Sequence, residues 1–100
     1  MNDYIFFMHD DVPDGRRRPV DEWEAYFASL RAVGAFLGGS AIGDGMCISK
    51  AGATAPVTRH LGGYIRVRAA DLAAARELVV GNPVYEAGGT VEIRELPRTT

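Results

Sequence analysis

The stretch "GGYIRVR", residues 62–68, decides the fold because its side chains alternate between polar and apolar. Tyr64, Arg66 and Arg68 fall on one side of an extended chain, and Ile65 and Val67 fall on the other. This period of two is typical of a β-strand with one dry face and one polar face. The sequence therefore predicts a strand here whose apolar side packs against the rest of the domain.

Two more strands are predicted near the two ends of the chain. "YIFFMH", residues 4–9, is a short apolar run that stops at the turn-forming residues "DDVPDG". "GTVEIREL", residues 89–96, again alternates apolar and polar side chains and ends before Pro97, which cannot donate to a strand ladder. In both "GGYIRVR" and "GTVEIREL", the apolar side chains are expected to face the helices.

Two helices are predicted between these strands. The first spans residues 21–36, and the second spans residues 71–80, with Gly81 just past its end and Pro83 as a stop. The first helix has apolar residues at the spacing of one helical stripe, namely Trp23, Tyr26, Phe27, Leu30, Val33 and Leu37.

A fourth strand is predicted over "MCISK", residues 46–50, after a run of glycines. Cys47 is the only cysteine, which excludes an internal disulfide and a thiolate-cluster metal site. Because free cysteine packs as a small hydrophobic side chain, we expect Cys47 to be buried and unreactive.

The resulting order, β-α-β-β-α-β, predicts an α+β fold of the ferredoxin-like (split βαβ) type. Both helices then cover one face of a four-stranded antiparallel sheet. The other face carries aromatic and charged side chains beside an apolar central strand, a mixture typical of an interaction surface. A second copy of the chain would cover it, and the outward residues are Tyr64, Arg66, Arg68, Glu92 and Arg94.

Length and charge limit the class of protein. A chain of 100 residues fits one domain, residues 1–100, and the net charge of -2 with a pI of about 5.6 disfavours nucleic-acid binding. The apolar run at residues 4–8 is too short for a signal peptide or a membrane span, so we expect a cytoplasmic protein.

No metal-ligand spacing and no nucleotide-binding glycine motif are present, so no metal or cofactor is predicted. Arg16, Arg17 and Arg18 are interpreted as part of a solvated loop.

Three segments together carry a family resemblance: "YIFFMHDD", "TRHLGGYIRV" and "GNPVYEAGGTVEIREL". They resemble the YCII-related, or DGPF-type, family of small bacterial proteins, and the likeness covers nearly the whole chain. The resemblance implies a dimeric α/β barrel, in which two ferredoxin-like sheets face each other across a two-fold axis and leave clefts between them. Such an interface must be self-complementary, and a patch carrying both Glu and Arg permits this.

The chain departs from the family pattern at positions that bear on chemistry. The Asp-Gly-Pro-Phe signature is absent, because the corresponding segment reads "ATAPVTRHLGGY". The resemblance implies a histidine at the start of the first helix and an aspartate before a proline after the second. Here these places read "PVDEWEAYF" and Asn82-Pro83, and an asparagine cannot hold a proton as a carboxylate does. The acid–base pair therefore does not carry over, whereas His9 stands where many relatives have a tyrosine at the end of the first strand.

The candidate site residues allow more than one interpretation. His9 is either a general base or a hydrogen-bonded surface group. Glu92, with Arg66 and Arg94, forms either an ion-pair network at a dimer interface or the polar lining of a cleft. Phe7 and Tyr64 would line such a cleft.

Three functions fit these residues. The leading one is a homodimer that binds a small molecule between its sheets, with Arg66 or Arg94 holding an anionic group. The second is a cofactor-free enzyme, of the isomerase or oxygenase type, with His9 as base. The third is a regulatory partner protein, which the resemblance implies through the family's tendency to be encoded near extracytoplasmic-function sigma factors. The residues name neither the ligand nor the reaction.

Overall fold

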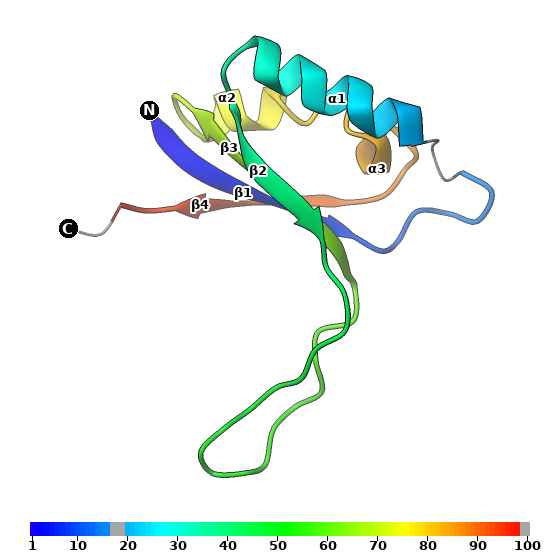
Figure 1. Ribbon diagram of the computed structural model, residues 1–100, viewed down its shortest axis with the longest axis vertical. Helices are drawn as coiled ribbons and strands as arrows, with labels where there is room; N and C mark the ends of the chain where they lie inside the picture. The colour runs from blue at the N-terminus through cyan, green and yellow to red at the C-terminus, as the bar shows by residue number, and fades with distance from the viewer. Residues whose placement is uncertain (17–19, 99–100) are drawn as a thin grey trace.

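Four antiparallel strands form one sheet in the order β2-β3-β1-β4 in the computed structural model, which describes residues 1–16 and 20–98 (Figure 1). β1 lies in the interior of the sheet, paired on one side with β3 and on the other with β4. The strands are β1 (Asn2–His9), β2 (Phe36–Ala41), β3 (Leu61–Ala69) and β4 (Val91–Leu96).

All three helices lie on the same face of the sheet (Figure 1). They are α1 (Val20–Ala32), α2 (Leu72–Glu77) and α3 (Pro83–Glu86). This arrangement confirms the predicted ferredoxin-like α+β fold with its four-stranded antiparallel sheet. The opposite face, which no described helix covers, is called the helix-free face below.

The core forms where the apolar sides of the strands meet α1 and α2. The β1 residues Tyr4 and Phe6 are 2% and 0% exposed, and Ile65 and Val67 of β3 are equally buried beside them. Val91 and Ile93 on the edge strand β4 pack against the same core but stay partly exposed. Ile65, Val67, Val91 and Ile93 thus face the helices as expected. Tyr26, Leu30, Ala75 and Val79 close the core from the helix side.

The predicted position of the second strand was wrong. β2 lies at Phe36–Ala41, inside and just after the segment assigned to the first helix, because α1 already ends at Ala32. Gly34 has φ of 70°, and the amides of Gly34 and Ala35 donate to the carbonyls of Arg31 and Leu30, which is a Schellman C-cap. The chain therefore turns before Phe36, and Val33 is left 67% exposed.

The second helix is shorter than predicted and is followed by a short third one. α2 starts after Asp71, whose carboxylate accepts from the Ala74 amide, and it ends at Glu77. Pro83, expected only as a stop, begins α3, where its missing N–H costs nothing. The Asn82 side chain caps α3 by accepting from the Val84 and Tyr85 amides.

Residues 42–60, called the arm below, join β2 to β3 and extend away from the domain (Figure 1). They include the segment "MCISK", which forms no strand, and every arm residue except Val57 is exposed. Cys47 is accordingly exposed, which corrects the expectation that it is buried. The apolar alternation around Met46 resembles that of a strand, but no part of the described domain packs against it.

Two expectations from the sequence concern the arginine run before α1 and the absence of a membrane span. Arg17 and Arg18 lie outside the described residues, so the solvated-loop interpretation concerns only the described Arg16, which is exposed. None of the helices within residues 1–16 and 20–98 is long and apolar enough to cross a membrane.

Candidate functional site

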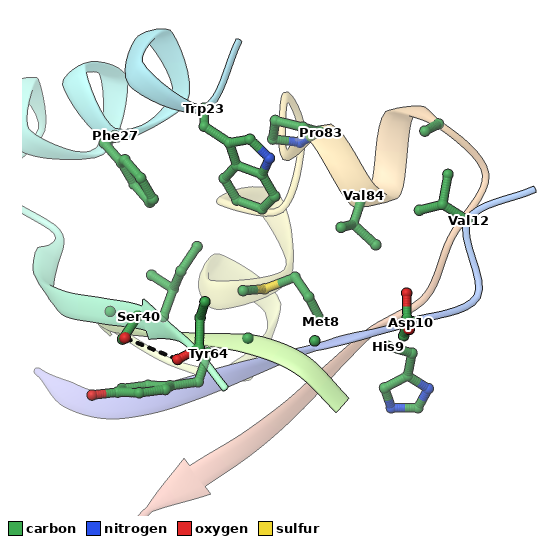
Figure 2. A pocket seen from close by; sticks show the side chains of 16 residues that line it. Met8, His9, Asp10, Val12, Trp23, Phe27, Ser40, Tyr64, Pro83 and Val84 are labelled. Atoms are coloured by element: carbon green, nitrogen blue, oxygen red, sulfur yellow. Dashed lines mark hydrogen bonds between the residues drawn. The ribbon is translucent and has the colours of Figure 1, made fainter. Parts of the chain in front are cut away.

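A pocket of about 510 Å³ lies between the sheet and helices α1 and α3. We call it the helix-side pocket. Figure 2 shows Trp23 and Phe27 reaching from α1 toward the sheet, with Pro83 and Val84 of α3 beside them. Met8 of β1 lies between these side chains and the strands. Most of the lining is therefore apolar, and much of it is aromatic.

The pocket exists because small residues occupy three neighbouring strand positions. Gly39 pairs with Ile65, Ala41 pairs with Gly63, and all of these residues border the pocket. A Cβ on Gly39 would meet the Tyr64 carbonyl oxygen at 2.6 Å, so glycine is needed for the close strand approach. A Cβ on Gly63 would lie 3.4 Å from the end of the Met8 side chain. Larger residues here would fill the space beneath Trp23 and Phe27.

A buried side chain positions the α3 wall of the pocket. Asn82 is fully buried at 0% exposed, and its Oδ1 accepts from the Val84 amide at 2.9 Å and the Tyr85 amide at 3.3 Å. These bonds fix the first turn of α3, and with it Pro83 and Val84. Below α1, the Tyr26 hydroxyl donates to the Leu78 carbonyl at 2.7 Å, and burial raises the pKa of Tyr26 to about 12.

Few polar groups border this pocket. Asp10 is exposed and lies past the end of β1, and its amide donates to the His60 carbonyl. The indole of Trp23 carries a donor that can orient a bound molecule (Figure 2). This combination suits a flat molecule with an apolar ring that is held by packing and oriented by a small number of hydrogen bonds.

A cluster of ionisable groups lies on the helix-free face at the end of β1. His9 Nε2 is 2.9 Å from Glu92 Oε1, and Glu92 Oε2 is 3.4 Å from an Arg94 guanidinium nitrogen. The hydrogen bond from His9, aided by the weaker one from Arg94, holds the pKa of Glu92 below its usual value. The ring of His60 meets that of His9 edge-on, with centroids 4.9 Å apart. We call His9, Glu92, Arg94 and His60 the His9 cluster.

The cluster determines which nitrogen of His9 is available. An ionised carboxylate can only accept, so Nε2 carries the hydrogen and Nδ1 carries the lone pair in neutral His9. The side chains of His9 and Glu92 are 20% and 36% exposed, so the pair is accessible but partly desolvated. A histidine oriented by a carboxylate in this way is a common acid–base arrangement.

The structure brings some of the predicted site residues together and separates others. Phe7 pairs with Tyr64 on one side and Glu92 on the other, so these three lie side by side on the helix-free face. Arg66 and Arg94 flank Ile5, two positions further along β1. Arg66 is exposed and forms no ion pair within the described part of the chain. β1 lies between Arg66 and Glu92, and Glu92 bonds to His9 and Arg94 instead. The expected pairing of Arg66 with Glu92 is therefore not made within one chain.

The predicted residues and the helix-side pocket overlap only at the rim. His9 and Tyr64 border the pocket, yet their rings lie on the opposite side of the sheet from Trp23 and Phe27 (Figure 2). The sequence interpretation missed the pocket because it placed Trp23 and Phe27 in an apolar helical stripe, a pattern that is typical of a filled core. The glycines of "LGGS" and "LGGY" were the available signal, since both segments lie on adjacent strands and leave no side chains to fill the space.

Among the described residues, no group of three histidine, cysteine or carboxylate side chains is arranged to hold a metal ion. Asp11 also has a lowered pKa, because its carboxylate accepts from both the amide and the hydroxyl of Thr90. Those bonds tie the segment after β1 to the start of β4, so Asp11 has a structural explanation.

Comparison with known proteins gives a family and a structural neighbour. The sequence profile of the YCII-related domain matches residues 5–99. No curated protein matches the chain by sequence. Among solved structures, the chain is similar to 5-chloro-2-hydroxyhydroquinone dehydrochlorinase (TftG) from Burkholderia phenoliruptrix AC1100, in its complex with 2,5-dihydroxybenzoquinone. The TM-score is 0.60 at 16% identity, over 97% of this chain and 95% of that one. At this identity the likeness concerns the fold alone.

Proposed function

Because the chain belongs to the YCII-related domain family, we propose that it is a homodimer that binds a small molecule carrying an apolar ring. The binding site is the helix-side pocket, and the helix-free face is the dimer interface. The single observation that carries the binding proposal is the pocket itself, which has about 510 Å³ beneath Trp23 and Phe27. Ligand sites typically have about 300–1,000 Å³ and a predominantly apolar lining.

The structural neighbour supports the choice of ligand class. TftG was solved with 2,5-dihydroxybenzoquinone, a small planar ring with polar substituents. A ring of that kind would lie against Trp23 and Phe27, with its polar substituents directed toward the open side of the pocket. Hydroxyquinones and other small hydroxylated rings are therefore the first probes to use.

A pocket-filling variant tests the binding site. Mass spectrometry of the purified protein under native conditions identifies a retained small molecule, and titration of 2,5-dihydroxybenzoquinone measures affinity through the fluorescence of Trp23, the only tryptophan. We expect Ala41→Phe, at an exposed position on the pocket wall, to weaken binding by roughly tenfold or more. Ala28→Phe, at an exposed position of α1 outside the lining, is the matched control. Equal affinity in both variants contradicts the pocket.

The His9 cluster favours a second candidate function, proton transfer to a small acidic or anionic molecule on the helix-free face. His9 Nδ1 would act as the base, Glu92 would orient the ring, and Arg94 would stabilise negative charge that develops on the substrate. This candidate uses the opposite side of the sheet, so its ligand does not depend on the helix-side pocket.

Paired variants separate this catalytic role from a structural one. With a substrate found by screening, His9→Gln should lower the rate by roughly 100-fold or more. Glu92→Gln should cause a smaller loss and a changed pH profile. Ala41→Phe should leave this reaction unchanged. Full activity in His9→Gln removes the candidate, and binding without any turnover leaves the first proposal alone.

A further inference from the structure

The first leg of the arm, residues 42–49, carries the side-chain pattern of a strand, but its residues are exposed. Ile42, Asp44, Met46 and Ile48 alternate with the small residues Gly43, Gly45, Cys47 and Ser49. In an extended segment these two sets face opposite ways. Met46 is 83% exposed and Ile48 is 90% exposed, so the apolar side of the arm lies in solvent.

Such a long exposed segment is unusual in a small domain. Loops of this length without secondary structure are uncommon and often functional. The radius of gyration is 15.0 Å, against about 13 Å for a typical compact domain of this length. The arm thus exposes apolar side chains that a partner surface would bury.

The direction of the arm indicates where that surface lies. Figure 1 shows the arm leaving the β2 and β3 ends of the sheet and running to the side away from the helices. That is the side of the helix-free face. A protein docked on the helix-free face would therefore meet the arm as well.

The reach of the arm is sufficient to cross a second sheet. Each leg has roughly nine residues, which span about 30 Å when extended at about 3.3 Å per residue. A four-stranded sheet is about 15 Å wide, with strands about 4.8 Å apart. One arm can therefore extend across the whole width of a partner's sheet.

One charge of the arm, which also carries Lys50 and Arg59, is complementary to one charge of the helix-free face. Asp44 is the only carboxylate in the arm. Arg66 is exposed on the helix-free face and has no ion pair within residues 1–16 and 20–98. A guanidinium that becomes partly desolvated in an interface needs an acid, and Asp44 of another copy can supply it.

We propose that the arm docks on the helix-free face of a second copy of this chain, an inference that rests on the proposed homodimer. Met46 and Ile48 pack against the apolar centre of that face, formed by Ile5 and Phe7, and Asp44 pairs with Arg66. By two-fold symmetry each protomer contributes one arm, and each arm contacts the helix-free face of the other protomer. This surface is exposed in the isolated chain and is buried in the proposed dimer.

Sedimentation velocity over a concentration series tests the arm directly. We expect Met46→Ser with Ile48→Ser to raise the dimer dissociation constant by roughly tenfold or more, because both side chains lose a buried apolar environment. Val33→Ser with Val80→Ser is the matched control, since these aliphatic residues are 67% and 70% exposed and lie outside both the arm and the helix-free face. Far-UV circular dichroism should be unchanged in both variants.

Charge exchange tests the proposed ion pair. Asp44→Lys and Arg66→Glu should each weaken the dimer, and the double variant should recover most of the loss, which a double-mutant cycle measures. A photo-crosslinker attached to Cys47, the only cysteine, should yield crosslinks between ¹⁴N- and ¹⁵N-labelled chains that map to β1 and β3.

The outcomes distinguish the two proposals. A wild-type protein that is monomeric throughout the series overturns both the homodimer and the docking of the arm. A stable dimer whose dissociation constant is unchanged by the arm substitutions overturns the docking of the arm and leaves the homodimer intact. Crosslinks confined within one chain have the same consequence.

Discussion

At the scale of single residues, Tyr26 combines a buried ring with one hydrogen bond between two helices. Its ring is 3% exposed and its hydroxyl donates to the Leu78 carbonyl at the end of α2. The residue therefore links α1 to α2 within the core. Because ionisation of the hydroxyl would place a charge in this apolar environment, the neutral form is favoured in the folded state.

We predict that Tyr26→Phe lowers the free energy of unfolding at pH 7 by about 1 kcal/mol, because the Leu78 carbonyl loses its donor. The folded pKa of about 12 lies above the ordinary value of 10.0. The stabilising contribution of neutral Tyr26 is therefore complete below pH 10 and is lost as the pH rises toward 12. The alkaline loss of stability should shrink in Tyr26→Phe. Urea unfolding at several pH values, at one fixed protein concentration, measures this.

Tyr85→Phe is the control for that experiment. Tyr85 is 50% exposed, so its stability at pH 7 should stay within about 0.5 kcal/mol of the unmodified protein and its alkaline loss should persist. If Tyr26→Phe and Tyr85→Phe behave alike, Tyr26 does not act through burial.

The identities of the site residues were not sufficient to predict how they are arranged. His9 and Glu92 were both candidates, but their hydrogen bond depends on a strand pairing between residues far apart in the sequence. Trp23 and Phe27 fit a helical stripe, and such a stripe looks the same above a filled core and above a pocket. The difference lies in Gly39 and Gly63, whose effect appears only when β2 and β3 are in register.

At the scale of elements, three strands followed from local pattern and one did not. β1, β3 and β4 have apolar runs or alternation typical of a strand, and their positions were predicted to within two residues. β2, "FLGGSA", contains two glycines and has no alternation to detect. The arm segment "MCISK" has the alternation but forms no strand, since it extends away from the sheet and pairs with none of the described strands.

β2 provides the second prediction. Gly39→Ala should lower the free energy of unfolding by about 1–3 kcal/mol, because its Cβ would lie 2.6 Å from the Tyr64 carbonyl oxygen and the paired strands would have to separate. Thermal or urea unfolding measures the loss. Gly45→Ala is the control, since a Cβ there has no atom within 4 Å. A Gly39→Ala protein as stable as Gly45→Ala would show that the β2–β3 pair has room to adjust.

At the scale of the whole molecule, the two faces of the sheet differ in what covers them. The helices bury one face, whereas the helix-free face has half-exposed Ile5 and Phe7 at its centre and charged residues around them. An apolar centre with a polar rim is the typical composition of a protein interface. The order of strands and helices made this asymmetry predictable, although the arm beside it was not.

The third prediction is therefore the size of the molecule in solution. Sedimentation equilibrium at micromolar concentration should give about twice the chain mass of 10.8 kDa. Phe7→Lys, at the centre of the helix-free face, should shift the protein toward the monomer, because a charge would be buried without a partner. A particle of 10.8 kDa at all concentrations contradicts the dimer.

The interior position of β1 has a consequence for how the chain is made. β1 emerges first among the strands, yet one of its edges is completed only by β4, which follows all the other elements. Such non-local pairing delays folding, since the connecting chain must be closed before the contact can form. A nascent chain that stalls before β4 would leave the Tyr4, Phe6 and Met8 strand open to pairing with other chains. The sheet should therefore be completed only when β4 is free to pair with β1.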